Sequence, residues 1–340
     1  MNCYIDTLAT YIELATTPTL NNDYTVWKFF PRQNTYESHY FVRYKNVTCC
    51  YYPNHYGIGR IWLIFSIPKL LKGNNIYPIT DDNIDIRLYQ IIHDILSELF
   101  DVTTIPTTNL ALWEVSRVDL FILHQIKPRS RKWYLQAYEK LTLGSYIPYK
   151  YKNTFYLNST LKKHKAAGGI IRIYPKPQEV YDTKTKLRNT IPKAIEKEFE
   201  AYMIVNDHLC DYIRLEFLFR RQLLRYFFGH AKSVNVADVM NEQFQVQHIN
   251  RMIVRLGLHR KIISRQNMKQ QLKNLFPKSP TRQRAEKYIS LVNSRGTYRQ
   301  TIKKQFTEGQ IRYIRKQLHD HHLHTIISEF EDLEPVQLLK

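Results

Sequence analysis

The chain has 340 residues, a formal net charge of +20 and 44% hydrophobic residues. This content excludes a disordered tail, and the length allows two domains or one large domain with an appendage. The basic excess predicts a polyanionic partner; nucleic acid is favoured, and a membrane surface is the competing partner. We expect no membrane association, because no signal peptide, spanning apolar run or basic amphipathic helix stands out. The four cysteines contain no C-x-x-C pair, which is typical of reduced thiols in a cytoplasmic protein.

The N-terminal part of the chain predicts several strands. Asn2–Leu14 is mostly apolar and β-branched, with Asp6 breaking the pattern. Two or three further strands are expected between Thr25 and Phe65, most clearly over Gly57–Phe65. The polar stretch Ser66–Asn75 contains a glycine and is expected to form a loop.

Helices and strands then alternate. Apolar residues recur at helical spacing over Asp85–Phe100. A strand from about Leu110 to Leu123 and a helix near Arg131–Leu143 are expected next. The glycine turn at Gly168 leads into a short strand that ends at Pro175, because proline removes a ladder donor. A charged helix is expected over about Thr190–Val205.

The last strand and the C-terminal third differ in character. Asp211–Arg220 alternates apolar and polar residues, which predicts a half-buried strand with one polar face. Helical patterns follow Gly229, and Arg255–Lys316 holds 17 lysines and arginines against two acids. We therefore predict domains at 1–228 and 229–340, the second helical and basic.

Three strands carry a polar pair at positions i and i+2: Arg117 with Asp119, Arg172 with Tyr174, and Arg214 with Glu216. Neighbouring strands would bring these side chains onto one polar face. The carboxylates of Asp119 and Glu216, with that of Asp6 as a further candidate, suit a hard ion such as Mg²⁺ or Mn²⁺. The alternative is that the pairs are ordinary ion pairs across adjacent strands.

Tyr174 is a candidate nucleophile. A metal ion would polarise a phosphodiester, and the tyrosine hydroxyl would attack phosphorus. A free tyrosine has a pKa of about 10. The metal ion, Lys176 and the arginines Arg117 and Arg214 would stabilise the phenolate and the developing phosphorane charge. The alternative is that Tyr174 is one structural aromatic among 25 tyrosines.

The C-terminal third offers a DNA-binding helix. Thr307 is a candidate N-cap, and Arg312, Arg315 and Lys316 project from the helix that follows. The pattern is similar to the recognition helix of a helix-turn-helix unit. The alternative is a solvated basic helix that touches phosphates without reading sequence.

A histidine cluster lies near the C-terminus, at His319, His321, His322 and His324. Helical spacing places them in two pairs that could bind a metal ion. A solvated, partly basic helix end is the favoured interpretation. The H-x-H tandem of many metal-dependent nickases occurs only in this tail, and we do not assign it that role.

The ordered set of motifs resembles the replication proteins of the filamentous-phage gene II/gene X type, which also occur on plasmids. Order and rough spacing agree over most of residues 1–230, and the basic region 307–323 resembles the C-terminal segment of that family. The motifs are Tyr4-Ile5-Asp6-Thr7-Leu8, the stretch Ser66–Asn75, Ser116-Arg117-Val118-Asp119, Tyr174-Pro175-Lys176 and Ile213-Arg214-Leu215-Glu216.

This resemblance implies a rolling-circle replication initiator that nicks one strand of duplex origin DNA, keeps the 5′ phosphate on Tyr174 and later rejoins the strand. Lys176 is the implied partner of the nucleophile. It further implies an α+β fold, with an antiparallel ferredoxin-like sheet of the HUH-nickase type, helices on one face and an all-helical basic C-terminal domain. We expect DNA contacts from Arg172, Lys69 and Asn75. A host helicase or polymerase is a further candidate partner.

Two alternatives remain open. A non-catalytic initiator or repressor would keep the basic charge without using Tyr174. A relaxase or single-strand transposase would share the chemistry in another biological role. No P-loop pattern is present in the sequence, and the covalent step preserves phosphodiester energy, so we expect no nucleotide cofactor.

Overall fold

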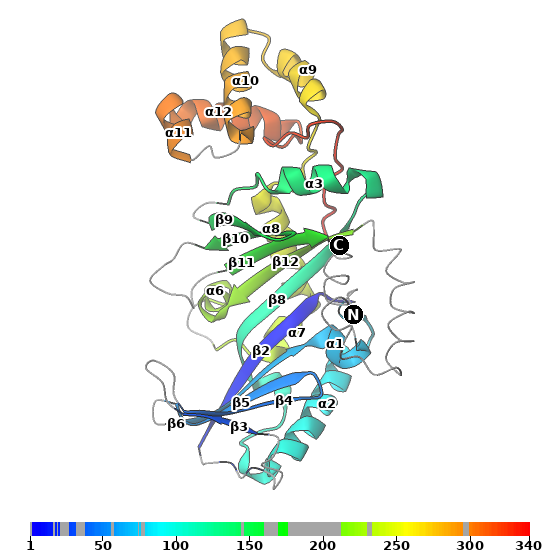
Figure 1. Cartoon of the computed structure of the whole chain (residues 1–340), viewed down its shortest axis with the longest axis vertical. Coiled ribbons are helices and arrows are strands. Elements are labelled where there is room, and N and C mark those ends of the chain that lie inside the picture. Colours follow the sequence, from blue (N-terminus) through cyan, green and yellow to red (C-terminus); the bar gives the residue numbers. More distant parts are fainter. Residues whose placement is uncertain are drawn as a thin grey trace. The chain divides into compact units, whose positions relative to one another are not determined.

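The protein is an α+β structure with a large antiparallel sheet, as the sequence predicted at this level. This computed structural model describes residues 2–15, 18, 20, 27–31, 38–55, 58–73, 75, 79–143, 146–159, 169–175, 212–229, 233–294 and 299–340. Ten strands follow the order β3-β4-β5-β6-β2-β8-β12-β11-β10-β9, and β1 pairs separately with β7 (Figure 1).

The strands within the described residues have the following bounds. They are β1 (Asn2–Cys3), β2 (Ile5–Leu14), β3 (Lys28–Phe30), β4 (His39–Tyr44), β5 (Val47–His55), β6 (Ile58–Ser66), β7 (Ile79–Thr80), β8 (Glu114–Gln125), β9 (Tyr146–Tyr151), β10 (Thr154–Ser159), β11 (Gly169–Pro175) and β12 (Tyr212–Arg220). The strand predicted over Asn2–Leu14 is found as two strands, β1 and β2, with a break at Tyr4. The strands predicted at Gly57–Phe65 and before Pro175 are confirmed within two residues.

The helices are divided between the middle of the chain and its C-terminal third. They are α1 (Ile67–Lys72), α2 (Ile84–Leu99), α3 (Arg131–Tyr138), α6 (Arg221–Phe227), α7 (Val236–Met240), α8 (Glu242–Leu256), α9 (Arg265–Leu275), α10 (Ser279–Asn293), α11 (Arg299–Gln305) and α12 (Glu308–Asp320). The helix expected over Asp85–Phe100 is confirmed as α2. The helix expected at 190–205 lies outside the described residues.

The chain forms two compact units, and each unit uses several separate segments. Unit 1 comprises Met1–Ile122, Thr160–Ile170 and Glu216–Ile249. Unit 2 comprises Leu123–Ser159, Ile171–Leu215 and Asn250–Lys340. The sequence placed one boundary near Gly229, where the composition changes. A change of composition along the chain marks a single point, whereas strand pairing joins segments that are far apart in sequence.

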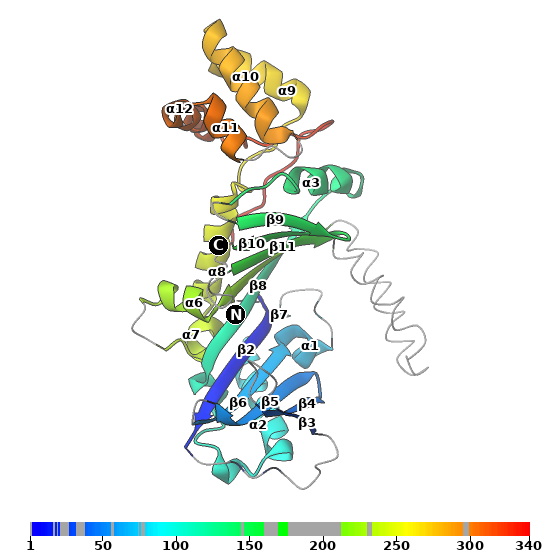
Figure 2. The same cartoon turned by 60° about the vertical axis from the view of Figure 1, so that its left-hand side comes forward.

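In unit 1, helix α2 lies against one face of the strands (Figures 1 and 2). Ile84, Leu88, Ile92, Ile95, Leu96 and Leu99 make its buried stripe. Tyr44 donates a hydrogen bond to Glu98 at the end of α2, and the ring of Tyr51 contacts that of Phe100 at 6.2 Å. The core of unit 1 therefore lies on the face of β4 and β5 that carries Tyr44 and Tyr51. The opposite face carries the candidate site.

Two β-bulges interrupt the antiparallel pairing of β2 with β8. Ile5 pairs with Leu120 but Thr7 pairs with Asp119, so Asp6 is an extra residue on β2. Ala9 pairs with Arg117 but Thr10 pairs with Val115, so Ser116 is an extra residue on β8, and its hydroxyl donates to the Ala9 carbonyl at 3.0 Å. Such bulges redirect side chains and are common beside active sites.

In unit 2, helices α9 to α12 share one hydrophobic core (Figure 2). Its buried members include Met268, Leu272, Phe276, Ala285, Tyr288, Ile289, Ile314 and Leu318. Helix α12 begins where the sequence predicted, because the Thr307 hydroxyl accepts from the Gln310 amide and the Gln310 side chain accepts from the Thr307 amide. None of the helices in the described ranges is long and apolar enough to cross a membrane.

Candidate functional site

The stretch expected to be a loop, Ser66–Asn75, contains a short helix, α1. The Ser66 hydroxyl accepts from the Lys69 amide at 3.5 Å, Pro68 occupies the first turn, and Gly73 ends the helix at φ 74°. Serine before the helix, proline in its first turn and glycine after it are the usual start and stop signals. Lys69, expected to contact DNA, is exposed on this helix.

Asp6 is the centre of a hydrogen-bonded group on the unit 1 sheet. Its Oδ1 accepts from the Ser66 hydroxyl at 3.3 Å and from the Asn75 amide at 3.1 Å, and its Oδ2 accepts from the Thr7 hydroxyl at 3.2 Å. The side chain is only 7% exposed. These three donors fix the orientation of the Asp6 carboxyl group at the bulge.

Asp119 lies on the same face as this group. Thr7 pairs with both Ser66 of β6 and Asp119 of β8, and residues opposite each other in a sheet share a face. Arg117 holds the buried Asp119 with its Nε at 2.7 Å from Oδ1 and its Nη2 on Oδ2. The two carboxylates, Asp6 and Asp119, thus flank Thr7, and the expected Arg117–Asp119 pair is an ion pair within one strand.

The predicted metal ligands fit a magnesium-type site only in part. Within the described residues, no three His, Cys, Asp or Glu side chains form a group that could hold a metal ion. Mg²⁺ and Mn²⁺ often bind one or two carboxylates together with waters and substrate phosphates. Asp6 and Asp119 have the chemistry for such a site, whereas a three-carboxylate cage with Glu216 is not seen there.

Strand β12 differs from the prediction. We expected one polar, solvated face, but every residue from Ile213 to Phe219 is buried. Arg214 is 0% exposed and Glu216 is 3% exposed. The alternation of the sequence is real, but a strand with neighbours on both sides can have both faces covered. The expectation of a half-buried β12 is therefore wrong.

In unit 2, Tyr174 lies on β11, one residue before the strand ends at Pro175. Only 7% of its surface is exposed, and Arg172 on the same strand is half-buried. Lys176, the expected partner of the nucleophile, lies outside the described residues. A nucleophilic Tyr174 would therefore have to turn its hydroxyl toward a bound DNA strand.

Searches of protein-family models, curated proteins and solved structures found no match to this chain.

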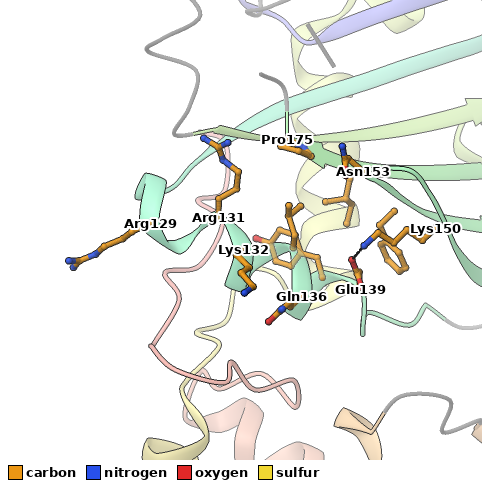
Figure 3. A pocket seen from close by; sticks show the side chains of 12 residues that line it. Arg129, Arg131, Lys132, Gln136, Glu139, Lys150, Asn153 and Pro175 are labelled. Atoms are coloured by element: carbon orange, nitrogen blue, oxygen red, sulfur yellow. Dashed lines mark hydrogen bonds and ion pairs between the residues drawn. The ribbon is translucent and has the colours of Figure 1, made fainter. Parts of the chain in front are cut away.

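A cavity of about 520 Å³ lies on the other side of β11. Ile173 and Pro175 line it, and because neighbouring side chains on a strand point to opposite faces, Tyr174 does not. Its basic lining consists of Arg129, Arg131, Lys132 and Lys150. Figure 3 shows Lys150 directed at Glu139 and Arg129 pointing away, and the Lys150–Glu139 ion pair is 2.5 Å long. No sequence pattern indicates this cavity, because its residues come from separate segments.

The candidate DNA-binding helix α12 carries its three expected cations, Arg312, Arg315 and Lys316, at exposed positions, and Tyr313 is exposed as well. Arg315 is anchored, since its Nε donates to the buried Tyr288 hydroxyl at 2.7 Å. Arg312 and Lys316 are therefore better placed than Arg315 to contact phosphates.

The histidine cluster does not form one group. His324 is buried, its Nδ1 accepts from the Ile326 amide at 2.9 Å, and its Nε2 lies 3.0 Å from the Leu256 carbonyl. Both ring nitrogens thus have backbone partners. His319, His321 and His322 are exposed on the surface, as the favoured interpretation expected.

Proposed function

We propose that the protein is a rolling-circle replication initiator that cuts and rejoins one DNA strand through a covalent bond to Tyr174. The observation that supports this most is the pair of oriented carboxylates, Asp6 and Asp119, on the unit 1 sheet face. The order of motifs and the charge of +20 support DNA as the substrate. In this proposal the sheet belongs to a ferredoxin-like nickase, and α9–α12 form a separate DNA-binding domain.

The chemistry is a pair of transesterifications. The Tyr174 oxygen attacks phosphorus and loses its proton, the bond from phosphorus to the 3′ oxygen breaks, and that oxygen takes up a proton as a free 3′ hydroxyl. The 5′ phosphate stays on Tyr174. Attack by a 3′ hydroxyl on this phosphotyrosine later reverses the step and releases the tyrosine.

Residues on the sheet would position the phosphate and offset its charge. Asp6 and Asp119 would hold Mg²⁺ or Mn²⁺, which supplies charge stabilisation at the phosphodiester when bound. Arg117 already lies against Asp119, and its guanidinium would neutralise charge that develops on the phosphate oxygens. Arg214 and Lys176 would act in the same sense beside Tyr174.

A second candidate is a DNA-binding initiator without catalysis. Two observations favour it: Arg117 occupies both oxygens of Asp119, and Tyr174 is almost fully buried. A relaxase or a single-strand transposase is a third candidate. Such enzymes would use the same catalytic residues and the same covalent step, and they would differ from an initiator in the DNA site that they cut.

A nicking assay separates these functions. Supercoiled plasmid that carries the element's own origin is incubated with the protein and Mn²⁺, and the protein is then digested and mapped by mass spectrometry. We expect nicking and a nucleotide on Tyr174, no nicking by Tyr174→Phe, and normal nicking by Tyr149→Phe, a control on an exposed strand residue of β9. An adduct on another tyrosine keeps the enzyme class but rejects Tyr174. Tight origin binding with no nicking supports the non-catalytic candidate.

A further inference from the structure

The face of the unit 1 sheet that carries Asp6 and Asp119 continues across β6, β5, β4 and β3 as cross-strand rows. The pairing places Phe41, Cys50, Trp62 and Tyr11 in one row, and Arg43, Thr48, Ile64 and Ala9 in the next. The row of Ser66, Thr7 and Asp119 lies beyond these. Rows are two residues apart along each strand, so each step is about 7 Å.

On β3, β4 and β5 the outermost row is a stack of aromatic rings, and on β6 and β2 it continues to Arg60 and Glu13, which form an ion pair. Phe30 of β3 pairs with His39 of β4, and their rings lie 5.2 Å apart at 13°. His39 and Tyr52 of β5 lie 5.0 Å apart at 26°. Phe30 is 44% exposed at the outer end of this stack. The stack is therefore already ordered, and its outer end is accessible to a further planar ring.

Positive charge surrounds these rings. Lys28 and Arg43 are exposed, and the Arg43 guanidinium lies 5.7 Å from the centre of the Phe41 ring. Strands β3, β4 and β5 contain no aspartate or glutamate. Stacked aromatics with lysine and arginine beside them suit bases and phosphates of a single strand, because every base has a face that can stack.

We propose that this surface, formed by Phe30, His39, Phe41, Tyr52, Lys28 and Arg43, binds single-stranded DNA by base stacking. We name it the aromatic row. Its outermost rings, Phe30, His39 and Tyr52, lie about 20 Å along the strands from the row that contains Asp119. The idea that the bound strand is the one cut near Asp6 rests on the proposed function; the binding itself does not.

The experiment measures binding of a fluorescein-labelled oligo(dT) of about 12 nucleotides by anisotropy, without metal ion and with Tyr174→Phe protein. We expect Phe30→Leu and Tyr52→Leu each to weaken binding by about 5- to 150-fold, the loss of one stacked base. Phe29→Leu is the matched control: it changes the neighbouring residue of β3, which is 54% exposed on the opposite face, and should leave binding unchanged.

Two further readouts identify what is lost. Arg43→Gln should flatten the dependence of log K on log salt by about 0.7, whereas Phe30→Leu should leave that slope unchanged. Replacing thymines by abasic sites should weaken binding to the parent protein and change binding to the Phe30→Leu and Tyr52→Leu variants less. These patterns separate stacking from general charge attraction.

Three outcomes would overturn the proposal. Equal losses in Phe29→Leu and Phe30→Leu would mean a folding effect, and no loss in either ring variant would mean that bases do not stack there. Tighter binding of oligo(rU) than of oligo(dT) would assign the surface to RNA. If the protein nicks DNA but Phe30→Leu and Tyr52→Leu bind oligo(dT) normally, only the proposal for the aromatic row is rejected. If these variants lose binding but the protein does not nick DNA, only the proposed nicking function is rejected.

Discussion

Lowering the pH should destabilise unit 2 through His324, and substituting this histidine should remove that part of the response. Burial is the main cause that lowers the pKa of His324 to about 4, and the charges of Arg260 and His259 act in the same direction. Protonation also has a local cost. Because Nδ1 accepts from the Ile326 amide, a proton on Nδ1 would break that hydrogen bond.

The magnitude follows from linkage. The folded state holds His324 neutral, so its contribution is fully present above the unfolded pKa of about 6.5 and is lost as the pH falls toward 4. The fall in the pKa from about 6.5 in the unfolded chain to about 4 in the folded protein corresponds to about 3 kcal/mol of folding stability, of which about 2 kcal/mol is lost by pH 5. His124, also buried in unit 2 and with its pKa lowered to about 4, should respond over the same pH range.

The assay is urea unfolding at pH 7.5 and pH 5.0. Between pH 7.5 and pH 5.0, the two buried histidines should lower the free energy of unfolding of the parent protein by about 4 kcal/mol. In His324→Gln only His124 remains, so the same change of pH should lower it by about 2 kcal/mol, whatever the stability of the variant at pH 7.5. His321→Gln is the matched control, since His321 is exposed at the end of α12 and should leave the pH response unchanged. An equal loss in the parent and in His324→Gln would refute the reasoning.

Four other predictions concern single residues. Gly257→Ala should lower the free energy of unfolding by more than about 1 kcal/mol, because Gly257 has φ +75° and an added Cβ would lie 2.8 Å from the His324 ring. Gly309→Ala, where an added Cβ has open space on α12, should raise it by up to about 1 kcal/mol; urea titration of both variants checks the pair. Asp6→Asn should strongly reduce nicking with little change in thermal unfolding, because the amide keeps the shape of the side chain and loses its charge; full nicking would contradict its role. Arg312→Gln should reduce the salt slope of duplex binding by about one phosphate contact, and an unchanged slope would count against α12 as a DNA-binding helix.

The elements that sequence reasoning found are those with a complete local signal. Thr307 and Gln310 contain both halves of a capping box, and α12 starts there. The stripe of α2 recurs at helical spacing, and it forms the buried side of that helix. These signals predict the helices correctly because residues within a few positions of each other in the sequence determine where each helix starts and which side of it is apolar.

The features that sequence reasoning missed depend on distant segments. The alternation of β12 predicted a polar face, but Arg214 and Glu216 are buried, and burial of a strand face depends on segments that are distant in sequence. The grouping of Asp6 with Ser66 and Asn75 depends on pairing between β2 and β6. The helix α1 is a different case, since its serine, proline and glycine were visible in the sequence and only the polar composition argued for a loop.

The bulge on β2 means that Asp6 is an insertion in the sheet. Ile5 and Thr7 pair with the consecutive residues Leu120 and Asp119, so a chain without Asp6 could close into a regular ladder with every other β2–β8 pair unchanged. A regular two-stranded ladder would have no position for this carboxylate.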